Sequence, residues 1–191
     1  MNTLNKERAF EYTRMANGFE YKRVAKWNGG AVPEELGGGS RENTRANPPF
    51  DLGLITEEIK EFYIALANDD LVEMVDAYCD VKFVYLGIVF KVGCTTASYT
   101  AIDINNHLKL VNDSEEVLSY ANRQMSAMRL ILSDFCITDR ILQQAFDIVC
   151  EANDQKGTIK DDKGKTMKGP KWVNPADTIK QLLIQYNVIW R

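Results

Sequence analysis

The stretch that decides the fold is Leu54-Ile-Thr-Glu-Glu-Ile-Lys-Glu-Phe-Tyr-Ile-Ala-Leu-Ala67, then Asn68-Asp-Asp70, then Leu71-Val-Glu-Met-Val-Asp-Ala-Tyr-Cys-Asp-Val-Lys-Phe-Val-Tyr-Leu86. In the first segment, apolar residues recur at helical steps of four, three and four and line up on one face. The second segment is apolar on nearly every side, which predicts a buried helix. The short polar break between them predicts two antiparallel helices within residues 54–92.

Acidic residues interrupt this apolar pattern at helical spacing. Glu58 and Glu61 lie three apart at the edge of the first apolar face. In the second segment Glu73, Asp76 and Asp80 are three and four apart and stack on one stripe. Burying unpaired carboxylates is costly, so cations must offset their charge. Carboxylate oxygens without His or Cys suit Mg2+ or Mn2+ rather than zinc.

Most of these acids also fit simpler structural roles. Asp70-Leu-Val-Glu73 is a capping-box pattern, in which Glu73 only closes a helix N-terminus. Glu57, Glu58 and Glu61 are equally compatible with a solvated helix face. No cap explains Asp76 and Asp80, which lie well inside an otherwise apolar helix. A metal site accounts for the whole set, and the pattern therefore favours it.

These residues carry a family resemblance. Glu58-x-x-Glu61 followed by Glu73-x-x-Asp76, with Asp80 one turn later, resembles the paired motif of the all-α nucleoside triphosphate pyrophosphohydrolases. That superfamily includes MazG, the dimeric dUTPases and the phosphoribosyl-ATP pyrophosphohydrolases. The resemblance implies an all-α helical bundle around two antiparallel metal-binding helices, completed by assembly into a homodimer or homotetramer.

The resemblance also implies an activity and roles for the acids. The expected reaction is hydrolysis of a nucleoside triphosphate to the monophosphate and pyrophosphate, with two or more Mg2+ or Mn2+ ions per site. The expected metal ligands are Glu58, Glu61, Glu73, Asp76 and Asp80. A carboxylate not saturated by metal, Glu57 or Glu58, is expected to act as the general base.

A second block near the C-terminus supports the same resemblance. Asn153 and Lys156 share a helix face, and a lysine- and glycine-rich loop with Lys165 and Lys168 follows. Asn is suited to a base or sugar edge, and lysines supply positive charge for phosphate. The same residues also fit a basic helix end followed by a flexible loop. In the MazG-like proteins a helix ending in Asn-x-x-Lys precedes a Gly-Lys-x-x-Lys-Gly-Pro loop, so these four residues are predicted to bind the substrate.

Composition sets broad limits on the protein. With 191 residues and 45% hydrophobic content, the chain is expected to form one domain, residues 1–191. A net charge of −4 gives no electrostatic case for binding nucleic acid or a membrane. The four cysteines form no C-x-x-C pair and are expected to be free thiols in a reducing compartment. The polar N-terminal sequence has no apolar signal segment, so we expect a cytoplasmic protein.

The rest of the chain predicts further helices and no strand, which gives an all-α fold class. A glycine- and proline-rich passage at about 17–49 is expected to be a long loop, which either folds over the site or is solvated. His107 is expected in a loop within a mixed connection at 93–112. The other expected helices span residues 5–16, 113–133, 139–153 and 174–187.

Two alternatives for the function stay open. One is a related all-α hydrolase with a narrower substrate, dUTPase-like or acting on phosphoribosyl-ATP, because the same metal helices serve all three. The other is a non-catalytic helical oligomerisation module, in which the acids form a polar seam between subunits.

Overall fold

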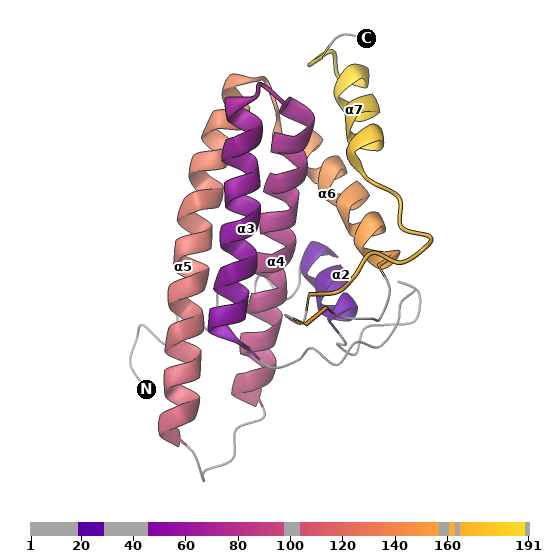
Figure 1. The fold of residues 1–191 in the computed structure, drawn as a ribbon. Coiled ribbons are helices and arrows are strands. Elements are labelled where there is room, and N and C mark those ends of the chain that lie inside the picture. The colour runs from indigo at the N-terminus through magenta and orange to yellow at the C-terminus, as the bar shows by residue number, and fades with distance from the viewer. Residues whose placement is uncertain (1–18, 29–45, 98–103, 157–160, 163–164, 190–191) are drawn as a thin grey trace. The chain divides into compact units, whose positions relative to one another are not determined.

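The computed structural model is all-helical over the residues that it describes, which are 19–28, 46–97, 104–156, 161–162 and 165–189. Figure 1 shows these helices in chain order. They are α2 (Phe19–Trp27), α3 (Pro48–Ala67), α4 (Leu71–Ala97), α5 (Ile104–Asp134), α6 (Asp139–Asp154) and α7 (Ala176–Gln185). The described ranges contain no strand, which confirms the predicted all-α fold class. None of their helices is long and apolar enough to cross a membrane.

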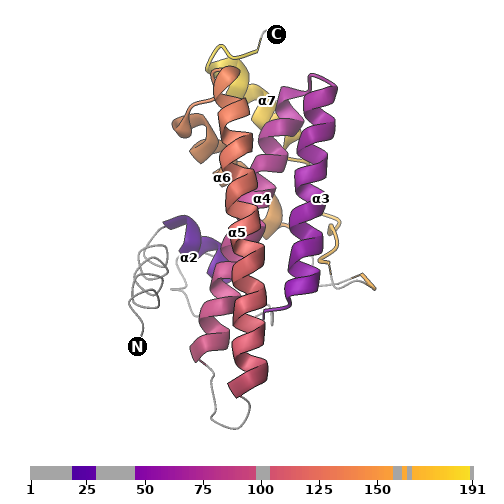
Figure 2. The same cartoon turned by 90° about the vertical axis from the view of Figure 1, so that its left-hand side faces the viewer.

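Helices α3 and α4 form the predicted pair and lie side by side in both views (Figures 1 and 2). The chain reverses at residues 68–70, where Asp69 takes a left-handed backbone conformation with φ of 54°. The Asp70 N–H donates to the Ala65 carbonyl at 2.9 Å, which closes the turn. The Asp70 carboxylate accepts from the Glu73 N–H at 3.1 Å and caps α4.

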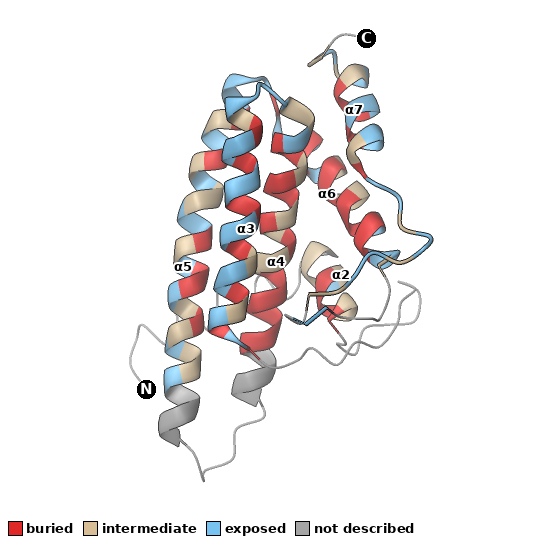
Figure 3. Cartoon of the chain, viewed as in Figure 1, coloured by how far each residue is buried: buried red, intermediate tan, exposed pale blue. Residues whose placement is uncertain are grey.

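The described chain divides into two compact units. One consists of Gly53–Phe83 and Ala121–Arg191, and it contains most of α3, the first half of α4, the end of α5, and helices α6 and α7. Each helix turns an apolar stripe inward, seen as the red side of each ribbon in Figure 3. The large side chains fully buried in this unit are Ile55, Phe62, Met74, Val75, Met128, Leu132, Ile141, Phe146, Ile179 and Leu183.

The other unit consists of Met1–Leu52 and Val84–Tyr120, of which α2, the start of α3, the end of α4 and the start of α5 are described. Its interior holds a salt bridge between Lys91 Nζ and Asp51 Oδ1 at 2.6 Å, with both side chains buried. The Asn47 N–H donates to the other Asp51 oxygen at 3.0 Å, so that both carboxylate oxygens are engaged at the start of α3.

Several boundaries differ from the prediction. Helix α2 occupies part of the passage at 17–49 that was expected to be a loop, and α3 already begins at Pro48. The connection expected at 93–112 is also wrong, because α4 runs to Ala97 and α5 starts at Ile104. The backbone of His107 is therefore helical. Ser114, at the expected start of the helix at 113–133, lies inside α5, and its hydroxyl donates to the Leu110 carbonyl at 2.8 Å.

The C-terminal helices agree with the prediction. Helix α6 begins at Asp139, after Thr138, whose hydroxyl accepts from the Ile141 N–H at 3.4 Å. Helix α7 begins at Ala176, whose N–H donates to the Asn174 side chain at 3.1 Å. The expected helix at 5–16 lies outside the described residues.

Candidate metal and nucleotide site

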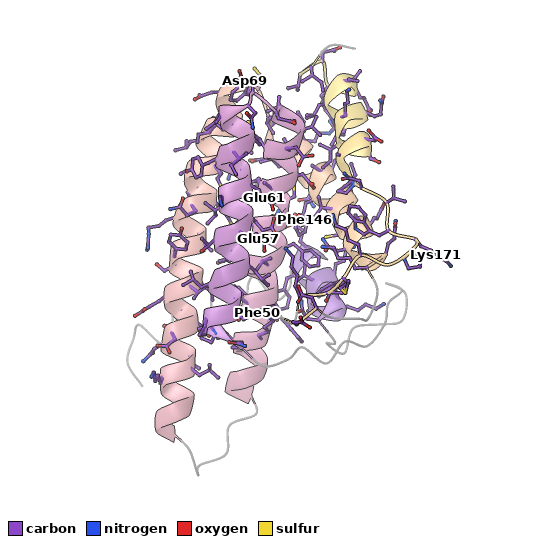
Figure 4. The ribbon with its side chains drawn as sticks, in the orientation of Figure 1. Phe50, Glu57, Glu61, Asp69, Phe146 and Lys171 are labelled. Atoms are coloured by element: carbon purple, nitrogen blue, oxygen red, sulfur yellow. The ribbon has the colours of Figure 1, made fainter. Side chains whose placement is uncertain are left out.

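The predicted site residues all belong to the unit that contains α6 and α7. Glu57, Glu58 and Glu61 lie on α3, and Glu73, Asp76 and Asp80 lie on the first three turns of α4. Figure 4 shows Glu57 and Glu61 one turn apart on α3. Asn153 is in the last turn of α6, Lys156 follows its end, and Lys165 and Lys168 lie in the next loop. The fold therefore collects both predicted blocks in one unit.

The carboxyl groups of Glu58 and Asp76 are held in an environment that disfavours their charge. Burial raises the pKa of Glu58 from 4.5 to about 9, with further contributions from Asp80 and Glu61. Burial likewise raises the pKa of Asp76 from 3.8 to about 8, with Asp80 and Glu73 adding to the effect. Because each acid responds to acids on the facing helix or the next turn, the carboxyls form one cluster across α3 and α4.

Glu73 and Asp80 complete this cluster. Burial raises the pKa of Asp80, and Lys156 and a hydrogen bond from Asn153 partly oppose the rise. The pKa of Glu73 is raised by partial burial and by the neighbouring acids Asp70 and Glu61. The Glu73 side chain does not complete a capping box, since the Asp70 N–H already donates to Ala65. The Glu73 side chain therefore belongs to the acidic cluster and does not serve as a helix cap.

Three lysines face the acids. Lys165 Nζ lies 2.9 Å from Glu57 Oε2 and 3.9 Å from Glu58 Oε1. Burial alone would lower the pKa of Lys165, but its hydrogen bond to Glu57 and the charge of Glu58 raise it overall. Burial lowers the pKa of Lys156 despite the attraction of Asp80 and Glu58. Lys168 is close enough to Glu73 to oppose the rise in the pKa of that acid.

Asn153 is placed differently from what a substrate contact requires. Its side chain is buried, and its amide donates to the Val149 carbonyl at 3.0 Å. The same side chain forms the hydrogen bond with Asp80. In this conformation Asn153 holds the Asp80 carboxyl in position, and its predicted contact with substrate stays a prediction.

The chemistry of the cluster fits a hard divalent cation. All its candidate ligand atoms are carboxylate oxygens, the type that Mg2+ and Mn2+ prefer. Asp76 Oδ1 is buried, and nothing in the described part of the chain forms a hydrogen bond to it. No three of the described His, Cys, Asp and Glu side chains converge closely enough to hold an ion as they stand. A bound cation would therefore have to draw these carboxyl groups together.

Two features of the site were not predicted from the sequence. One is that Lys156, which is half-buried, is a counter-ion of Asp80 and Glu58, because spacing along one helix does not reveal what faces it. The other is the indole of Trp172, which lies against Lys168 with Nζ 3.8 Å from the ring centroid. The only signal for Trp172 was its position directly after Gly169-Pro170-Lys171 in the predicted substrate loop.

Comparison with known proteins points to a family of hydrolases. Residues 51–107 match the model of the family described as phosphoribosyl-ATP pyrophosphohydrolase. Searches of the curated proteins and of the solved structures gave no match. The matched segment contains all six acids of the cluster and stops before the block that contains Asn153 and the lysines. The match supports the resemblance to the MazG-like all-α pyrophosphohydrolases, and with it a pyrophosphohydrolase activity in general.

Proposed function

We propose that this pyrophosphohydrolase acts on a nucleoside triphosphate, releasing the monophosphate and pyrophosphate in a reaction that depends on Mg2+ or Mn2+. The observation that carries the proposal is the cluster of carboxyls across α3 and α4, with three lysines opposite it. A highly charged polyphosphate and divalent cations together match both sets of charges. Neither set is needed for a helical bundle to fold.

The acids would hold the cations. Glu58, Glu61, Glu73 and Asp76 are the proposed ligands of two or more ions, with Asp80 at the margin. When bound, such ions would neutralise charge on the phosphates and activate a water molecule for attack. The orphaned Asp76 Oδ1 supports this assignment, as do the carboxylate oxygens of the cluster, which hard divalent cations prefer.

The remaining residues would position the substrate and move a proton. Lys165 and Lys168 project from the loop over opposite parts of the cluster and would contact phosphate oxygens. Glu57 is half-exposed and pairs with a partly exposed lysine, so it is a better general base than the buried Glu58. Displacement of Lys165 toward phosphate would free the Glu57 carboxylate to accept a proton.

A second substrate fits the match equally well. Phosphoribosyl-ATP carries the same triphosphate chain, and the matched family is named for that substrate. The described acids and lysines would bind the metal ions and the phosphates, which are the same for both substrates. The choice between them depends on contacts with the nucleoside.

The test is a substrate panel followed by pyrophosphate release. Ribo- and deoxyribonucleoside triphosphates and phosphoribosyl-ATP are each supplied with Mg2+ or Mn2+. We expect turnover of at least one compound, abolished in Glu61→Gln and in Asp76→Asn. Glu151→Gln, an exposed acid on α6 outside the cluster, is the matched control and should retain full activity.

Thermal melting separates an enzyme from a non-catalytic module. A protein that binds Mg2+ in its native state is stabilised by the ion, whereas a polar oligomer seam is not. If no compound in the panel is hydrolysed and Mg2+ leaves the melting temperature unchanged, the proposal is wrong.

We also propose that the protein assembles as a homodimer or homotetramer. Large apolar side chains are exposed on two helices of the unit that contains the site, and their relative exposures are 40% for Tyr63, 50% for Ile64 and 70% for Leu130. Covering these side chains with another subunit would remove their apolar surface from water. Light scattering coupled to size exclusion should give a mass of two or four chains, and a monomer at micromolar concentration would contradict the proposal.

A further inference from the structure

The indole of Trp172 is held in a defined place beside the end of α6. The backbone N–H of Trp172 donates to the Gly169 carbonyl at 3.0 Å, which forms a turn. The next residue, Val173, donates its N–H to the Gln155 side chain at the C-terminus of α6, also at 3.0 Å. These two hydrogen bonds therefore hold the backbone that carries the indole beside the C-terminal end of α6, close to Lys156.

The indole has an unsatisfied donor. Its Nε1 atom is buried, and no described residue accepts a hydrogen bond from it. Tryptophan N–H groups that leave water usually find an acceptor, because an unpaired buried donor is unfavourable. The face of the ring is occupied by the exposed Lys168, whose ammonium makes a cation–π contact. Trp172 thus presents an aromatic face covered by a long, exposed side chain, together with a donor that lacks an acceptor.

The position of the indole relative to the charges indicates what could bind there. Lys165 lies over Glu57 and Glu58, the acids of α3. The charge of Lys168, which lies against the indole, lowers the pKa of Glu73 at the start of α4 and the pKa of Lys156. A polyphosphate that bridges the two loop lysines would bring one of its ends beside Trp172. The flat apolar face of the ring, which Lys168 covers, suits a heteroaromatic base there.

We propose that Trp172 is the residue that contacts the base of the bound nucleotide. The base stacks on the ring face that Lys168 covers, Lys168 moves to the phosphates, and Nε1–H donates to an acceptor on the nucleoside. This inference rests on the proposed function, because it assumes that the lysines and acids bind a polyphosphate. Stacking tolerates any base, so Trp172 distinguishes nucleotides from base-free polyphosphates and not one base from another.

Equilibrium binding to the full chain with Mg2+ tests the inference without requiring turnover. The probes are the α,β-methylene analogues of dATP and dCTP, together with inorganic tripolyphosphate, which has no base. The variants are Trp172→Leu, which removes stacking and the donor, and Trp172→Phe, which removes only the donor. Val173→Ala, at an exposed neighbouring position, is the control, and melting curves verify that each variant is folded.

In Trp172→Leu we expect both analogues to bind about 10- to 100-fold more weakly, in line with the loss of one base–aromatic contact. Tripolyphosphate should change by less than about twofold, because it makes no stacking contact. Trp172→Phe should lie between wild type and Trp172→Leu. A parallel loss for all three probes would overturn the inference, because the indole would then only position Lys168.

One further result separates this inference from the proposed hydrolysis. If wild type binds the analogues no more tightly than tripolyphosphate, no base is read and the inference about Trp172 is wrong. The protein could then still release pyrophosphate from a compound in the substrate panel. That assay tests the proposed function independently of Trp172.

Discussion

Replacing Glu58 with Gln should stabilise the protein when divalent ions are absent. An acid whose pKa is higher in the folded than in the unfolded chain binds more protons when folded, so stability falls as pH rises between the two values. For Glu58 that window runs from 4.5 to about 9. Each pH unit within it costs about 1.4 kcal/mol, which gives a penalty of about 3 kcal/mol at pH 7. Gln keeps the size of the side chain and never ionises, so the variant avoids this penalty.

Urea denaturation in EDTA measures the effect. At pH 7 we expect Glu58→Gln to unfold with a free energy about 2–3 kcal/mol above wild type. The difference should shrink toward zero near pH 4.5, where the folded wild-type protein keeps this carboxyl protonated and the penalty has almost vanished, and grow at pH 8.5. Glu151→Gln makes the same chemical change at an exposed site of α6 and should alter stability by less than about 0.5 kcal/mol.

The reasoning would be refuted if Glu58→Gln were no more stable than wild type at pH 8.5 in EDTA, or if wild-type stability rose with pH across the window. Added Mg2+ supplies a second comparison. It should stabilise wild type and have little effect on the variant, because the variant lacks one proposed ligand.

Three other substitutions test separate parts of the fold. Asp51→Asn removes the charge opposite the buried Lys91 ammonium and should lower the unfolding free energy in urea by about 3–5 kcal/mol. The double variant Asp51→Leu with Lys91→Met removes both charges and should recover most of that loss. Asp70→Ala removes the cap of α4 and should cost about 1 kcal/mol, with the helix otherwise retained by circular dichroism. Cys136 has a left-handed backbone conformation with φ of 63°, which glycine adopts without steric strain. Cys136→Gly should therefore raise the unfolding free energy by up to about 1 kcal/mol, and a decrease would show that the Cys136 side chain contributes to packing.

The central helices were predictable because their sequence signals agree with one another. Apolar periodicity, the polar break at 68–70 and the Asp70 cap all point to the same turn between α3 and α4. Helix α6 was also predicted, at 139–153, and it runs from Asp139 to Asp154. The four-residue spacing of Asp76 and Asp80 also predicted that they lie on the same face of a helix.

Other elements were beyond such reasoning, because tertiary packing overrides local preference. A helix was expected to begin at 113, yet Asp113 and Ser114 lie inside α5, where the Ser114 hydroxyl donates to a carbonyl of its own helix. Helix α2 is short and lies in a passage rich in glycine, so its pattern was too weak to predict. The burial of Asn153 depends on how α6 is rotated toward α4, which spacing along α6 does not determine.

The raised pKa values of two cluster acids have a consequence for how ions enter the site. Near neutral pH, Glu58 and Asp76 both hold protons in the ion-free protein, since their pKa values are about 9 and about 8. The proposed divalent cations would bind both acids as carboxylates, so their uptake would release protons to the solvent. The heat of Mg2+ binding should therefore vary linearly with the ionisation enthalpy of the buffer, and the slope counts the protons exchanged for each ion. If the proposed ions bind there, the affinity of the site for metal should increase with pH until both acids are ionised.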